Sequence, residues 1–130
     1  KKEFYLVFSV FAYHHVPDSE KGNYLEKVLS GLNEGGVLIL TEIYLPSKDV
    51  ALEYYEKLLS EIPNRTPLIE RFLRETAAST DYEYKVAKWF DDAQLKELGF
   101  TEVESVKIWP LDNTFEENVG TFVQVLKRKA

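Results

Sequence analysis

The chain has 130 residues, 45% of them hydrophobic, which is enough for one domain with a buried core and too short to expect two. It contains no cysteine, which excludes a disulfide scaffold and a cysteine nucleophile, and no apolar run of about 18 residues that would indicate a membrane span. With 16 basic and 22 acidic residues, the net charge of −6 gives no general attraction to nucleic acid, and we expect a cytoplasmic protein.

The first part of the chain has the pattern of a strand, a crossover helix and a parallel strand. Residues 4–11 would place apolar side chains on both faces of a strand, which is typical of a strand covered by helices on both sides. Apolar residues recur at helical spacing over 23–32, and Gly35 and Gly36 supply the backbone freedom that stops this helix. A second apolar run occupies 37–44, which predicts a right-handed crossover between parallel strands.

Residues 46–90 indicate helices rather than further strands. Ser47 is the expected N-cap of a helix that Pro63 stops, and a second helix is expected to begin near Thr66 and Pro67. A connection of this length between strands usually carries function rather than framework. We therefore expect a helical insertion or lid over 46–90.

The aromatic residues of this segment divide into core and pocket candidates. Tyr55 and Phe72 recur at helical spacing with other apolar residues, which favours the core. Trp89 and Phe90 are expected between helices and are the better candidates for lining a substrate pocket, with Tyr82 and Tyr84 as further candidates for an apolar lid.

The C-terminal part predicts a helix and two strands. Asp91 and Asp92 are expected to cap a short helix that ends at Gly99. Residues 101–109 and 121–126 have strand patterns, and the connection between them is too short for a helical crossover, which predicts an antiparallel hairpin. The whole chain, 1–130, therefore reads as a single α/β domain of two parallel strands, helices and a terminal hairpin.

Three motifs, taken in order, carry a resemblance to a known family. The first strand is followed by His-His-Val-Pro-Asp at 14–18, the crossover helix ends in Leu-Asn-Glu-Gly-Gly at 32–36, and a later helix ends in Leu-Gly-Phe at 98–100 before the hairpin. In this order they resemble the C-terminal half of a class I S-adenosylmethionine-dependent methyltransferase, a Rossmann-like fold whose last strand inserts beside the strand that matches 37–44.

The resemblance implies S-adenosylmethionine as cofactor and a small molecule as methyl acceptor. It places Ser9, Val10 and Phe11 beside the cofactor, at the carboxyl end of the first strand. The family's glycine-rich loop and ribose-binding acidic residue have no counterpart in these residues. Because the sequence also contains no methionine, even at position 1, we expect a truncated or partial copy whose cofactor-binding half precedes Lys1.

The candidate catalytic residues follow the ends of the two parallel strands, where ligands of open α/β sheets bind. Either His14 or His15 would serve as general base, since adjacent side chains point in different directions and a histidine titrates near neutral pH. Glu42, at the end of the second strand, would face the acceptor, or alternatively cap a helix or pair with a lysine. The histidines with Asp18 and Glu20 match no metal-ligand spacing, so we expect no metal.

An alternative function remains open at the level of sequence. The alternative to an enzyme is a non-catalytic half-domain that acts as a binding or assembly module. In that case residues 4–11 would form an unpaired apolar edge strand, and such edges promote association. We therefore expect a homodimer through the first strand, with no nucleic-acid or membrane partner.

Overall fold

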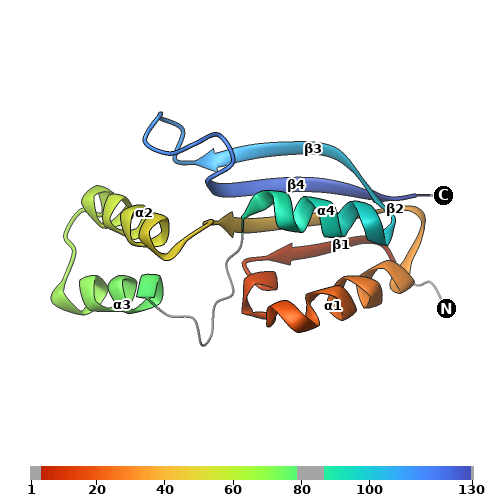
Figure 1. Ribbon diagram of the computed structural model, residues 1–130, viewed down its shortest axis with the longest axis horizontal. Coiled ribbons are helices and arrows are strands. Elements are labelled where there is room, and N and C mark those ends of the chain that lie inside the picture. The colour runs from red at the N-terminus through yellow and green to blue at the C-terminus, as the bar shows by residue number, and fades with distance from the viewer. Residues whose placement is uncertain (1–3, 79–86, 130) are drawn as a thin grey trace.

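The computed structural model describes residues 4–78 and 87–129, which form a four-stranded sheet with the order β1-β2-β4-β3 (Figure 1). Strands β1 (Phe4–Val10) and β2 (Leu32–Tyr44) are parallel, and β4 (Gly120–Arg128) runs antiparallel to both β2 and β3 (Phe100–Trp109). The predicted crossover and terminal hairpin are confirmed. The last strand lies between β2 and β3, as the resemblance implied.

Helices α1 (Asp18–Gly31) and α4 (Lys88–Leu98) lie side by side on one face of the sheet (Figure 1). Their apolar faces and the facing strand residues form a core around Leu25, Leu40 and Leu95. Arg128 donates hydrogen bonds to the carbonyl oxygens of Leu29 and Leu32 at 2.7 and 2.6 Å. The last strand is thus tied by Arg128 to the end of α1 and to the start of β2.

Helices α2 (Lys48–Glu61) and α3 (Pro67–Ala78) pack against each other beyond the carboxyl end of β2 (Figure 1). The Ser47 hydroxyl accepts a hydrogen bond from the Val50 amide at 3.2 Å, which confirms the predicted N-cap. A second apolar cluster, which includes Tyr55 and Val119, joins this helix pair to the β3–β4 connection. Tyr54 fixes α2 to β4 through a 2.6 Å hydrogen bond between its hydroxyl and that of Thr121.

Several predicted boundaries were wrong. Helix α1 begins at Asp18 rather than 23, and β2 begins at Leu32 rather than 37 because Leu32 already pairs with Phe4. Gly35 does adopt a left-handed φ of +71°, but within β2, where the pairing with β1 shifts register, and not at the end of the helix. Glycine is the residue that adopts such a backbone without strain.

Helix α4 and one aromatic residue also differ from expectation. Helix α4 starts at Lys88, whose amine lies 2.7 Å from Asp92 one turn later, so Asp91 and Asp92 lie inside the helix and do not cap it. Tyr55 is buried, as predicted, but Phe72 is 64% exposed and the prediction that it is core was wrong. The physical reason is that, within the described residues, α3 packs mainly against α2, and its other side is open.

The face of the sheet opposite α1 and α4 is apolar and uncovered in the described part of the chain. On β1, Leu6, Phe8 and Val10 are 46%, 63% and 57% exposed, and on β3 the side chains of Val106 and Ile108 are each 44% exposed. The expectation that residues 4–11 are covered on both faces thus holds for one face only. Within residues 4–78 and 87–129, no helix is long and apolar enough to cross a bilayer.

Candidate functional site

Three segments meet at the carboxyl ends of β1 and β2. A single 3-10 turn, Tyr13–His15 (η1), follows β1. The end of β2 lies beside it, and the first turn of α4 reaches the same edge of the sheet from the helix-covered face (Figure 1). In open α/β sheets this edge is where ligands bind.

His14 and Glu42 form a buried pair at this edge. The Nδ1 atom of His14 lies 3.1 and 3.0 Å from the two carboxylate oxygens of Glu42, and the two residues are 4% and 2% exposed. Burying a carboxylate is costly unless it is hydrogen-bonded, so the pair fixes the ring orientation as well as satisfying Glu42. The sequence named both residues but did not predict their contact.

His15 and Phe11 border the buried histidine. His15 is exposed, and its ring centroid lies 4.4 Å from that of His14. The Phe11 ring centroid lies 6.5 Å from the His14 ring, and Phe11 has a φ of +53°, in the left-handed region that non-glycine residues rarely adopt. Strained backbone of this kind concentrates at functional sites.

The other residues expected beside a cofactor point to opposite faces of β1. The Ser9 hydroxyl is buried against α1, 3.4 Å from the hydroxyl of Tyr24. Val10 is exposed on the open face of the sheet, in pleat alternation with Ser9. Of this predicted trio, only Phe11 borders His14.

Trp89 and Phe90 lie in the first turn of α4, not between helices as expected. Their rings meet edge to face with centroids 6.1 Å apart, and their side chains are 71% and 39% exposed. They lie on the same turn of α4 as Asp91. Tyr82 and Tyr84, the other expected lid residues, lie outside the described residues.

A buried polar cluster near His14 and Glu42, formed by Tyr13, Asp91 and Gln94, was not recognised from the sequence. Asp91 is 1% exposed, and the Tyr13 hydroxyl lies 3.4 Å from its Oδ1 atom and 3.2 Å from Oε1 of Gln94. Burial raises the pKa of Asp91, Lys21 opposes this shift and the nearby Glu42 adds to it, with a resulting pKa of about 7. The Tyr13 pKa is raised as well, chiefly by burial. Asp91 was misread as a helix cap because α4 begins three residues earlier, at Lys88.

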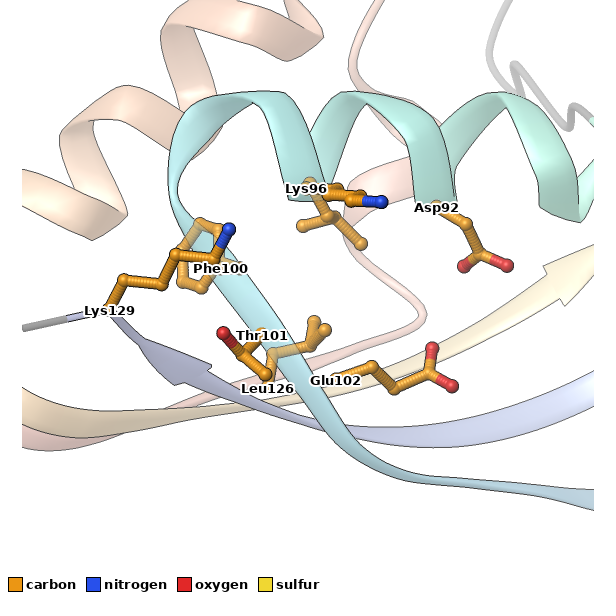
Figure 2. Close-up of a pocket in the computed structure, with 8 residues that line it drawn as sticks. Asp92, Lys96, Phe100, Thr101, Glu102, Leu126 and Lys129 are labelled. Carbon is orange, nitrogen blue, oxygen red and sulfur yellow. The ribbon is translucent and has the colours of Figure 1, made fainter.

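A cavity of about 340 Å³ lies elsewhere, between α4 and strands β3 and β4 (Figure 2). Its charged rim comes from Asp92, Lys96 and Lys129. Leu95, Phe100 and Leu126, which line its base, belong to the core and are at most 2% exposed. The cavity includes none of the predicted site residues, so it is not the candidate site.

Apolar surface borders the buried pair of His14 and Glu42 at this edge. The Phe11 side chain, which is 41% exposed, supplies this surface. Within the described residues no glycine-rich loop lies at this edge for the close approach that a nucleotide requires. Nor does any group of three His, Asp or Glu side chains in that part of the chain lie close enough to hold a metal ion.

No protein-family model matches the chain, and no curated protein matches it in sequence. Its fold does match solved structures. One is a 1,6-didemethyltoxoflavin-N1-methyltransferase from Burkholderia thailandensis, solved with 1,6-didemethyltoxoflavin and S-adenosylhomocysteine: the TM-score is 0.62 at 13% identity, over 100% of this chain and 46% of that chain.

Two further structures agree with the first. A SAM-dependent methyltransferase from Methanosarcina mazei matches with a TM-score of 0.64 at 16% identity, over 98% of this chain and 60% of its own. The cyclopropane synthase MmaA2 from Mycobacterium tuberculosis matches with 0.63 at 13% identity, over 98% and 56%. The chain thus spans about half the length of these proteins and has the fold of the C-terminal half of class I methyltransferases.

Proposed function

We propose that the protein takes part in S-adenosylmethionine-dependent methyl transfer to a small-molecule acceptor, with His14 as the general base. The observation that carries this proposal is the buried His14–Glu42 pair at the ligand-binding edge of a methyltransferase-like sheet. The similar structure with bound S-adenosylhomocysteine and a small-molecule ligand supports the same class of reaction.

The chemistry of the pair follows from its hydrogen bonds. An ionised Glu42 accepts from Nδ1–H of His14, so Nε2 is the ring nitrogen that carries the lone pair. Nε2 takes the proton of an acceptor hydroxyl or amine as that atom is methylated, and Glu42 stabilises the resulting imidazolium. A positioned base of this kind accelerates a reaction by about 10²–10⁴-fold.

S-adenosylmethionine supplies an activated methyl group on a sulfonium. Residues Ser9, Val10 and Phe11 would flank its methionine end, with Phe11 next to the catalytic ring. Trp89 and Phe90, on the first turn of α4, would line the acceptor side, with α2 and α3 of the segment 46–90 as a lid. Much of the rate would come from holding acceptor and methyl group in line.

We further propose that this chain works as one half of a larger methyltransferase unit. Two observations support this: the similar structures are about twice as long, and the uncovered sheet face is apolar. A companion segment that adds helices to this face and a strand beside β1 would also bring the nucleotide-binding loop. The rival proposal is a non-catalytic assembly module that forms a homodimer through β1.

Calorimetric titration with S-adenosylmethionine separates these proposals. We expect weak or no binding by the chain alone and clear binding when the companion half is joined to it, by expression of the whole gene. The assembly-module proposal prevails if neither form binds.

In the form that binds, transfer of labelled methyl groups to a panel of hydroxyl and amine acceptors tests the base. We expect His14→Gln to lower the transfer rate about 100-fold with cofactor affinity unchanged. His15→Gln should lower it far less, because the His15 ring is exposed. Equal losses in both variants would show that His14 is not the base.

A further inference from the structure

Asp91 is a buried carboxyl group that the proposed reaction does not use. It lies in the first turn of α4 and is 1% exposed. Burying a carboxyl group costs free energy unless the group is hydrogen-bonded, so the partners of Asp91 matter. The hydroxyl of Tyr13 lies 3.4 Å from its Oδ1 atom and 3.2 Å from Oε1 of Gln94, and the nearby hydroxyl of Tyr44 donates to Oε1 of Gln124 at 2.6 Å.

These two tyrosines belong to the elements that carry the catalytic pair. Tyr13 directly precedes His14 in η1, and Tyr44 follows Glu42 by two residues on the same face of β2. Asp91 is therefore a point at which α4 contacts the turn that carries His14. The ring of Tyr13 is fully buried against Tyr24, with centroids 5.7 Å apart.

The turn that holds His14 has little support from its own backbone. Two hydrogen bonds define η1, from His15 N to the Ala12 oxygen at 3.1 Å and from Val16 N to the Tyr13 oxygen at 3.0 Å. Short 3-10 turns have poor hydrogen-bond geometry and depend on their surroundings. The side chain of Tyr13 is the part of η1 that anchors the turn in the core.

We propose that Asp91 is a positioning residue, which holds His14 against Glu42 through the hydroxyl of Tyr13. The inference rests on the proposed role of His14 as base and adds that α4 sets its geometry. Asp91 contacts no acceptor or cofactor in this role.

The charges around Asp91 are consistent with a neutral carboxyl group in the working protein below about pH 7. Glu42 of β2 disfavours a negative charge on Asp91, whereas Lys21 of α1 favours it. The Lys21 amine lies 2.9 Å from Asp18 and 5.1 Å from the centroid of the Tyr13 ring. On α4 itself, Asp92 binds Lys88 and not Tyr13. A neutral Asp91 both donates and accepts, as an amide does.

The test follows the proton on His14 Nδ1, which a carboxylate acceptor moves downfield in the proton NMR spectrum. The resonance is assigned by its absence in His14→Gln and followed below pH 7 in the full chain. Asp91→Asn should keep it, because the amide reproduces the neutral acid. Asp91→Leu and Tyr13→Phe should each shift it upfield and speed its exchange with water about tenfold or more.

Asp92→Asn is the matched control, because Asp92 lies on the same turn without contact to Tyr13, and it should leave the resonance in place. The proposal is overturned if Tyr13→Phe, which preserves the ring that packs in the core, leaves the resonance and its exchange unchanged. The measurement needs no cofactor and no acceptor. A failure of cofactor binding would therefore contradict the proposed function and leave this result standing.

Discussion

At the scale of single residues, the ionisation of Asp91 links the site to stability. Its pKa rises from 3.8 in a solvated chain to about 7 in the fold, chiefly because burial disfavours the charged form. Between about pH 4 and pH 7 the unfolded chain loses this proton while the folded protein keeps it. The wild-type protein therefore loses stability across that window, and above pH 7 the loss stays constant.

Asp91→Asn removes this titration. We expect the variant to match wild type near pH 4, because the neutral acid and the amide are similarly desolvated. At pH 8 it should exceed wild type in free energy of unfolding by about 4 kcal/mol, the equivalent of the shift in the Asp91 pKa from 3.8 to about 7. Urea denaturation at several pH values measures the difference. The exposed Asp49→Asn, in the first turn of α2, gives the background curve. A difference that does not change with pH would contradict the assignment.

His14 and Glu42 were identified as site candidates from the sequence, but the contact of Asp91 with Tyr13 was not predicted. The reason is the distance between these two residues along the chain. The contact between Tyr13 and Asp91 joins residues 78 positions apart. Periodicity and capping rules describe neighbours within a few residues, so they predict faces of elements and not which faces meet. At Asp91 the capping rule also failed, because the ion pair between Lys88 and Asp92 supports an extra turn upstream.

At the scale of elements, the order of strands and helices could be predicted because each has a local pattern. Ser47, Pro63 and Gly99 mark helix ends by chemistry that acts within one turn, and all three ends were placed closely. Phe72 was misplaced because helical spacing identifies an apolar stripe without showing what covers it. Burial of such a stripe depends on a partner element, which spacing cannot identify.

Two glycines test how far local backbone geometry sets element stability. Gly22 lies inside α1, where an added Cβ would meet the flexible end of Gln94 at 3.3 Å. Gly120 starts β4 with a φ of +131°, and an added Cβ would lie 2.6 Å from the carbonyl oxygen of Trp109. The first position tolerates alanine and the second does not.

We expect Gly22→Ala to stabilise the protein by about 0.5 kcal/mol, since alanine favours helix over glycine. Gly120→Ala should destabilise it by more than about 2 kcal/mol, through backbone strain and the clash. Urea midpoints of the two variants measure the contrast. Similar midpoints for both would mean that the start of β4 relaxes without cost.

At the scale of the whole molecule, the sheet is covered on one face only within the described residues. Leu6, Phe8 and Val10 leave an apolar surface on β1, which is also an edge strand paired with β2 alone in the described part of the chain. Exposed apolar patches next to an unpaired strand promote association. The same surface would dock a companion half, so the two proposals for the molecule compete for one face.

Phe8→Lys and Phe72→Lys form a matched pair for this surface, because their side chains are 63% and 64% exposed on β1 and α3. The chain alone should self-associate, and Phe8→Lys should shift it toward monomer because a buried interface would have to desolvate the new charge. Phe72→Lys, with the same change of charge away from the sheet, should not. Light scattering at increasing concentration measures the mass. A wild-type chain that stays monomeric would show that solvent covers the face, and equal effects of both variants would assign association to net charge rather than to β1.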